Sequence, residues 1–274
     1  MNIIRKLFSI EWIKIRRRSV FWVVVGVHIM LLAVSLGIQQ YMHAVKPTNS
    51  PFQLPADWMI LIQIGSQAGM LLLLIGVTLL IASETAWRTQ RQNVIDGLSR
   101  GEYFAGKILI VLLLAGIFWV DIIVVGLIIA PFGGEGSLTW PVLSPIAQQM
   151  LPNVLLYLLA LGVTAFMCGM LASTSGAALG MILAFVMIQP LISGVMIARG
   201  GYLPVISRYL PMDVFSNLVS VGSYDAERLA LMNERILSRK MPALLSLHTS
   251  QLFTVIYIAV FIGFTWFIFR KRDL

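Results

Sequence analysis

The sequence predicts an all-α polytopic membrane protein with six transmembrane helices, an amphipathic N-terminal helix and an extracytoplasmic helical segment between spans five and six. Of its 274 residues, 58% are hydrophobic and 12% are charged, and the mean hydropathy is +0.88. Soluble domains carry about twice that share of charged residues. The charged residues cluster in a few segments, and the runs between them reach the roughly 20 residues that a helix needs to cross a bilayer. We therefore expect residues 1–274 to form a single transmembrane domain.

The N-terminal segment 2–17 is predicted to form a helix that lies on the membrane surface. At a period of 3.6 residues, one face is apolar and the opposite face is basic. Glu11 and Lys14 interrupt the apolar face. The alternative is the ordinary basic flank of a signal anchor. The first apolar run is expected to remain as an anchor, because no small-residue cleavage site follows it.

The apolar runs define six predicted spans, each long enough to cross a membrane as a helix. They are residues 20–41, 57–83, 107–131, 146–172, 176–197 and 249–269. Only the residues Ser173-Thr174-Ser175-Gly176 separate the fourth span from the fifth, and they predict a tight turn at the membrane surface. If these two spans formed one helix, the count would be five.

The distribution of basic residues predicts that both termini lie in the cytoplasm. The proposed cytoplasmic parts hold thirteen of the twenty Lys and Arg residues: six in the N-terminal segment, four in 84–107 and three at the C-terminus. The first two outer loops hold only Lys46. The outer segment 198–248 carries six, but the rule weakens for long loops.

The outer segment 198–248 is the least hydrophobic part of the chain. Pro204 and Pro211 interrupt its first half. Ser223 or Asp225 is predicted to cap an amphipathic helix that runs to about Lys240.

The loop between spans two and three carries the most informative motif. The chain leaves the membrane at an acidic residue, continues through a short polar segment and re-enters after Gly, Arg and Lys residues. The residues of this motif are Glu84, Arg88, Arg91, Asp96, Gly97, Arg100 and Lys107. Together with the six-span layout and the closing sequence Phe269-Arg270-Lys271-Arg272-Asp273-Leu274, this motif resembles type-two ABC transporter permeases.

The resemblance implies a mechanism and a set of partners. Residues 86–98 would form a coupling helix that docks on a separate ATPase subunit, and the seven motif residues would serve this coupling. ATP and magnesium would bind to that ATPase, while this chain would hold no cofactor. A second copy or a homologous permease would complete an alternating-access exporter in the inner membrane of a prokaryote. The simpler alternative for the loop is a solvated charged segment.

Five polar residues interrupt the predicted spans and are candidates for a polar pathway, because charged or polar groups inside a bilayer need protein or water partners. They are His28, Gln63, Gln67, Asp121 and Gln189. Asp121 suits either a hydrogen bond to a neighbouring helix or a proton relay with His28. The relay would make the chain an ion-coupled secondary transporter, which is the main alternative function. A non-transporting membrane scaffold is a second alternative.

Several function classes are disfavoured. The basic residues lie at the edges of apolar runs, where lipid headgroups rather than nucleic acid would meet them. The sequence contains no His-Glu-x-x-His metal motif and no phosphate-binding loop, so we expect neither a catalytic nor a metal site. Cys168 is the only cysteine and is interpreted as a packing residue. The scarcity of charge along the spans favours a hydrophobic or amphipathic cargo such as a lipid, peptide or drug.

Overall fold

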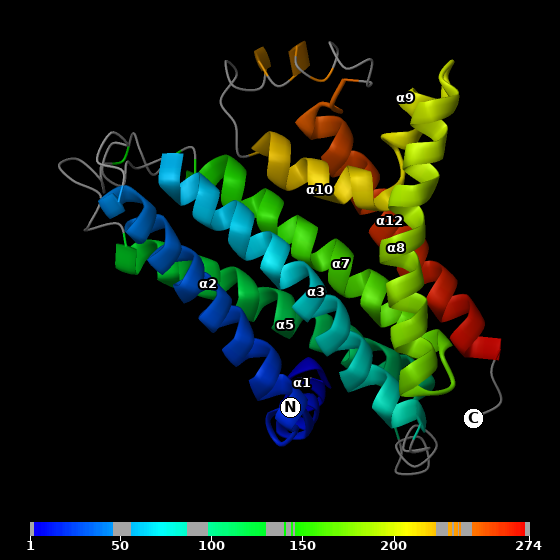
Figure 1. Ribbon diagram of the computed structural model, residues 1–274. Coiled ribbons are helices and arrows are strands. Elements are labelled where there is room, and N and C mark those ends of the chain that lie inside the picture. The colour runs from blue at the N-terminus through cyan, green and yellow to red at the C-terminus, as the bar shows by residue number, and fades with distance from the viewer. Residues whose placement is uncertain are drawn as a thin grey trace.

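The structure, a computed structural model, describes residues 3–45, 56–86, 98–129, 140, 144, 146–222, 230, 231, 233, 234, 236 and 243–271. Within these ranges every regular element is helical, which confirms the predicted all-α class. Five helices of this described part are long and apolar enough to cross a membrane, and a sixth is added if the bent pair α1 and α2 counts as one span. The long helices lie side by side as a tilted bundle (Figure 1).

The helices follow the predicted apolar runs but extend beyond most of them. Their bounds are α1 Ile3–Arg16, α2 Ser19–Val45, α3 Ala56–Ala86, α5 Arg100–Ile129, α7 Leu151–Leu171, α8 Ser175–Arg199 and α12 Leu247–Lys271. A short π-helix, η2 Ile146–Met150, precedes α7. The third predicted span began at residue 107, whereas α5 begins seven residues earlier, because a polar first turn also adopts helical geometry.

The first two helices form an elbow. The axes of α1 and α2 differ by 80°, and residues 17 and 18 connect them. The indole Nε1 of Trp22, near the start of α2, donates a hydrogen bond to the carbonyl oxygen of Arg16 at 2.8 Å. Tryptophan favours the membrane–water interface, where its apolar ring and its polar N–H both find suitable surroundings.

Helix α7 occupies the centre of the bundle, where it packs against α3, α5 and α12. Gly162 permits the close approach to α5, because a Cβ at this position would lie 2.6 Å from a methyl group of Val111. A short break separates the fourth and fifth predicted spans into α7 and α8. Helix α7 ends at Leu171, and the hydroxyl of Thr174 accepts a hydrogen bond from the backbone N–H of Ala177 at 3.1 Å, which caps α8.

Two helices cover the end of the bundle opposite α1. Helix α9, Leu203–Ser207, follows α8, and α10, Pro211–Gly222, lies across the bundle against α7 and α12 (Figure 1). One face of α10 buries Val214, Phe215 and Leu218. From the same helix, the Asn217 amide donates to the Ser250 hydroxyl at 2.6 Å and to the Leu245 carbonyl at 2.8 Å.

Helix α10 was not predicted, because Pro211 was interpreted as an interruption although proline is favoured in the first helical turn. The apolar spacing of residues 214, 215 and 218 was the available signal. Most of the helix predicted from Ser223 or Asp225 to Lys240 lies outside the described residues, since 223–229, 232, 235 and 237–242 are not described.

Candidate functional site

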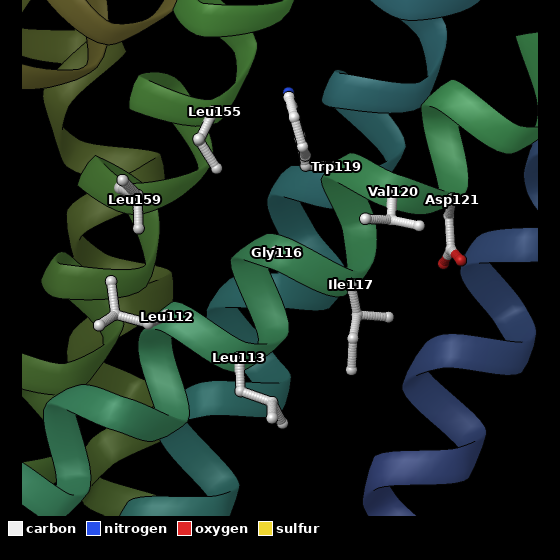
Figure 2. A pocket seen from close by; sticks show the side chains of 9 residues that line it. All are labelled: Leu112, Leu113, Gly116, Ile117, Trp119, Val120, Asp121, Leu155 and Leu159. Carbon is white, nitrogen blue, oxygen red and sulfur yellow. The ribbon is translucent and has the colours of Figure 1, made fainter. Parts of the chain in front are cut away.

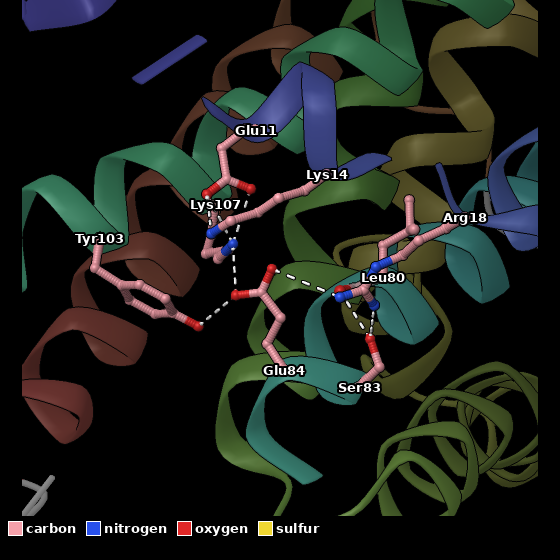
Figure 3. Close-up of polar contacts among 8 residues, drawn as sticks. All are labelled: Glu11, Lys14, Arg18, Leu80, Ser83, Glu84, Tyr103 and Lys107. Atoms are coloured by element: carbon pink, nitrogen blue, oxygen red, sulfur yellow. Dashed lines mark hydrogen bonds and ion pairs between the residues drawn. The ribbon is translucent and has the colours of Figure 1, made fainter. Parts of the chain in front are cut away.

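A buried cluster of charged side chains joins α1 to the ends of α3 and α5 (Figure 3). It begins at Glu11, which lies on the apolar face of α1 beside the buried residues Leu7 and Ile15. Only 6% of Glu11 is exposed. Its two carboxylate oxygens accept hydrogen bonds from the ammonium group of Lys107 at 2.9 and 2.8 Å. The acidic interruption of the amphipathic helix is therefore its point of attachment to α5.

Lys107 is the centre of this cluster, and its side chain is fully buried. Its Nζ atom lies 2.8 Å from Oε2 of Glu11 and 2.8 Å from Oε2 of Glu84. The Tyr103 ring lies beneath the ammonium group, 5.0 Å from Nζ to the ring centroid. A buried ammonium ion is tolerated only when its charge and its donors are satisfied, and here two carboxylates provide both.

Glu84, two residues before the end of α3, connects the cluster to the elbow between α1 and α2. The Tyr103 hydroxyl donates to Oε2 of Glu84 at 3.3 Å. Nη2 of Arg18 lies 3.9 Å from Oε1 of Glu84, and the same guanidinium donates to the Ser83 hydroxyl. Lys14 lies 3.6 Å from Glu11 at the outer edge. We call Glu11, Lys14, Arg18, Glu84 and Lys107 the ionic network.

The ionic network lies where the loop between α3 and α5 leaves the bundle. Helix α3 ends at Ala86 and α5 begins at Arg100, so residues 87–99 connect them. Ser99 and Glu102 form a capping box at the start of α5, in which each side chain binds the backbone N–H of the other at 2.8 and 3.2 Å. Nη1 of Arg100 donates to the carbonyl oxygen of Arg270 in α12 at 2.9 Å. Both stems of the loop are thus attached to neighbouring helices.

The structure places three of the seven residues predicted for coupling. Glu84 and Lys107 bind each other, and Arg100 contacts the last turn of α12. The other four, Arg88, Arg91, Asp96 and Gly97, lie outside the described residues, as does most of the predicted coupling helix 86–98. Sequence reasoning missed the roles of Glu11, Arg18 and Tyr103. The signal for Glu11 was its position on an apolar face, but its partner is 96 residues away.

A second buried polar site lies inside the bundle. His28 of α2 is fully buried, and its Nδ1 lies 3.3 Å from Oδ2 of Asp121 in α5. Its Nε2 lies 3.2 Å from the carbonyl oxygen of Gly65, which can only accept, so Nε2 carries a proton. A hydrogen bond between Nδ1 and the carboxyl group then needs one further proton, held by either residue. The two side chains therefore form a hydrogen bond in which either residue is the donor.

Close packing holds the His28 ring in place. The ring stacks on Phe118 at 4.2 Å between centroids with an interplanar angle of 8°. A Cβ at Gly69 would lie 3.3 Å from Nε2 of His28 and 3.3 Å from the Phe118 ring, and a Cβ at Gly65 would lie 2.7 Å from Leu32. Gly69 thus makes room for the imidazole between α2, α3 and α5, and Gly65 makes room for Leu32 on the same face of α2.

Asp121 also borders a groove of about 710 Å³ between α5 and α7 (Figure 2). Apart from Asp121, leucine, isoleucine and valine side chains, Gly116 and Trp119 line it. The Trp119 indole donates to the Leu151 carbonyl at 2.9 Å and so bridges the two helices. The groove is therefore apolar with one acidic group at its edge.

The remaining intramembrane candidates do not join this pair. Gln67 is exposed, Gln63 is half-buried, and Gln189 is buried beside the carboxyl group of Asp213 in α10, whose charged form it favours. Of the five residues predicted for a polar pathway, the structure brings together only His28 and Asp121 among the described contacts.

Comparison with known proteins identifies the family. A search of curated proteins found no significant match. The family model described as ABC-2 family transporter protein matches residues 7–191. This range holds the elbow, the ionic network, α2, α3, α5, α7 and most of α8, and it covers well over half of the chain. The match confirms the resemblance indicated by the loop motif. The chain therefore belongs to the ABC-2 family of transporter proteins.

Proposed function

We propose that this chain is the permease subunit of an ATP-driven exporter that moves a hydrophobic or amphipathic cargo. A separate ATPase subunit would bind ATP and magnesium, while this chain supplies the path through the membrane. The observation that supports the proposal most directly is the ionic network, because Lys107 binds both Glu11 and Glu84 beside the stems of the loop 87–99. A partner that docks on this loop would act on α3, α5 and α1 together.

The packed side chains of the ionic network form a stiff connection between helices. Side-chain contacts within a packed core transmit displacement between elements that have few alternative arrangements. Closure of the ATPase would push residues 87–99, and Glu84 and Lys107 would pass that displacement to Glu11 and the N-terminal helix. Arg100 would pass it to α12. The spans would then rearrange by alternating access.

The membrane arrangement belongs to the same proposal. We place six spans, α2, α3, α5, α7, α8 and α12, in the inner membrane of a prokaryote, with α1 lying along the cytoplasmic surface. The 80° bend after α1 supports an orientation close to the membrane plane. Helix α1 and the C-terminal end of α12 lie at the same end of the bundle (Figure 1). The basic residues at this end favour the cytoplasmic side.

We further propose that the permease works as a dimer, with a second copy or a homologous chain. Helix α8 is among the least buried of the candidate spans. Gly176, Gly180 and Gly194 on this helix have open space where a Cβ would point. Small residues permit two membrane helices to approach closely. A cargo path between two copies would suit an apolar or amphipathic molecule, since α8 presents few charged groups.

The test is an affinity pull-down of the detergent-solubilised chain, followed by an ATPase assay on the soluble subunit that it retains. Glu84→Gln removes one carboxylate that binds Lys107, and Glu234→Gln, an exposed residue, is the matched control. We expect wild type and control to stimulate the ATPase equally, and Glu84→Gln to lose most of the stimulation while still binding. Purification without an ATPase, or equal stimulation by all three, would contradict the proposal.

The His28–Asp121 pair favours one alternative, a proton-coupled secondary transporter. An Asp121→Asn variant separates the two functions, because asparagine can donate its amide proton to neutral His28 but cannot exchange it. Under the ABC proposal, transport in proteoliposomes stays dependent on ATP and nearly unchanged. Loss of transport with intact assembly would support proton coupling instead.

A further inference from the structure

A second pocket lies at the elbow between α1 and α2, outside the ionic network but next to it. It encloses about 440 Å³. Its walls come from the connection between α1 and α2, from the end of α3 and from the start of α8. The polar side chains that line it are Arg17, Arg18, Ser19, Ser83 and Ser175, and no carboxylate is among the lining residues.

The side chains of this pocket suit a phosphate group. Two guanidinium groups provide positive charge and several N–H donors, and three serine hydroxyls provide further donors. Arg18 is already shared with Ser83 and Glu84. Arg17 is exposed and has no carboxylate partner within the described residues. The pocket thus holds positive charge, at Arg17, that no carboxylate of the described residues neutralises.

The pocket also has an apolar side, and a neighbouring tryptophan indicates its position relative to the membrane surface. Val20, Leu79 and Leu80 complete its lining. Trp22, one turn into α2, is exposed and binds the Arg16 carbonyl through its indole N–H, as expected for a residue at the membrane–water interface. We therefore expect the pocket to lie at the level of the lipid headgroups. At this level its hydrogen-bond donors would face the phosphate, and its apolar side chains would face the start of the acyl chains.

We propose that this pocket binds the phosphate of an anionic phospholipid, with Arg17 and Arg18 as its cationic ligands. The phosphodiester accepts from the guanidinium groups and serine hydroxyls, and the glycerol and upper acyl chains contact Val20 and Leu80. The amphipathic face of α1 keeps the elbow in the interface. A bound headgroup would compete with Glu84 for Arg18, so lipid binding would alter the edge of the ionic network.

Native mass spectrometry of the detergent-purified full chain tests the proposal, with dioleoylphosphatidylglycerol and dioleoylphosphatidylcholine as probes. Arg17→Gln removes a lining cation, whereas Arg16→Gln removes the neighbouring charge, which does not line the pocket. We expect Arg17→Gln to weaken binding of the anionic lipid at least about fivefold and Arg16→Gln to change it by less than about twofold. Equal losses in both variants would show diffuse surface attraction and overturn the site.

Two further measurements complete the test. Ser175→Asp places a negative charge at the first residue of α8, where helix geometry favours an acidic side chain, so this variant should fold and still reject the anionic lipid. Inorganic phosphate at millimolar concentration should not displace the lipid. If phosphate displaced it fully, or if phosphatidylcholine bound equally well, the lipid assignment would be wrong.

Discussion

The two buried ionic sites of this protein differ in how completely their charges are satisfied. In the ionic network, Lys107 has two carboxylates within 2.8 Å, and Glu84 has two further contacts, with Arg18 and Tyr103. In the pair inside the bundle, Asp121 has the single partner His28 among the described contacts and borders an open groove. The first arrangement is held by contacts from several sides, whereas the second depends on one hydrogen bond and adjoins an open groove.

This difference separates a mechanical role from a chemical one. A buried network whose members satisfy one another loses several kcal/mol when one member is removed. A pair joined by one hydrogen bond of 3.3 Å loses much less when an isosteric amide replaces its acid. Substitutions that remove a charge or add a methyl group should therefore lower the free energy of unfolding more at the ionic network than at the His28–Asp121 pair.

The largest effect is expected from Lys107→Met. The variant keeps most of the apolar stem but leaves Glu11 and Glu84 buried without their shared cation, which costs about 3–5 kcal/mol. We expect a markedly lower thermal unfolding midpoint in detergent, measured by scanning fluorimetry. We also expect faster aggregation. Lys14→Met is the matched control, because its partly exposed ion pair is worth less than about 1 kcal/mol. Equal midpoints for the two variants would show that the network is not a stabilising attachment.

The apolar pattern predicted the helices well, because each long helix has to match the thickness of a bilayer. It also located the break at Ser173 to Ser175, where the side chains are polar and Thr174 caps the next helix. Glu84 and Lys107 were predicted as functional from the loop motif alone, without knowledge that they bind each other.

The partners of the charged residues could not be predicted, for a physical reason. Helical periodicity shows which face a residue occupies, but not which helix covers that face. Glu11 and Lys107 are separated by 96 residues, and His28 and Asp121 by 93. Helix α10 was missed for another reason, since Pro211 was interpreted as an interruption although proline is favoured in the first turn of a helix.

A smaller effect is expected from Gly69→Ala at the His28 site. The new methyl group would lie 3.3 Å from Nε2 of His28 and from the Phe118 ring, so the stacked ring has to shift. Crowding of this kind costs roughly 1–3 kcal/mol. Gly263→Ala in α12 is the matched control, because its Cβ meets open space and alanine favours a helix by roughly 0.5–1 kcal/mol. The two variants should shift the unfolding midpoint in opposite directions, and a stabilised Gly69→Ala would show that the imidazole is loosely held.

The smallest effect concerns Asp213 in α10, an acidic residue outside the spans. Like the ionic network it has several polar neighbours, but like Asp121 it is only partly buried. Burial raises the pKa of Asp213 above its ordinary value of 3.8, although Ser193, Arg208 and Gln189 favour its carboxylate form. The folded protein therefore holds this proton more tightly than the unfolded chain does. The resulting stability is fully present below 3.8 and is lost as the pH rises through the raised pKa.

Asp213→Asn should remove this pH dependence. The unfolding midpoint of the variant relative to wild type should be higher at about pH 7 than at about pH 4. The difference amounts to a few tenths of a kcal/mol, because the half-exposed carboxyl group is screened by solvent. Glu234→Gln, at an exposed position in the same outer segment, should leave the pH profile unchanged. If Asp213→Asn instead lost stability more strongly at pH 7 than at pH 4, the carboxylate would be held by its partners like those of the ionic network, and burial would not dominate its energetics.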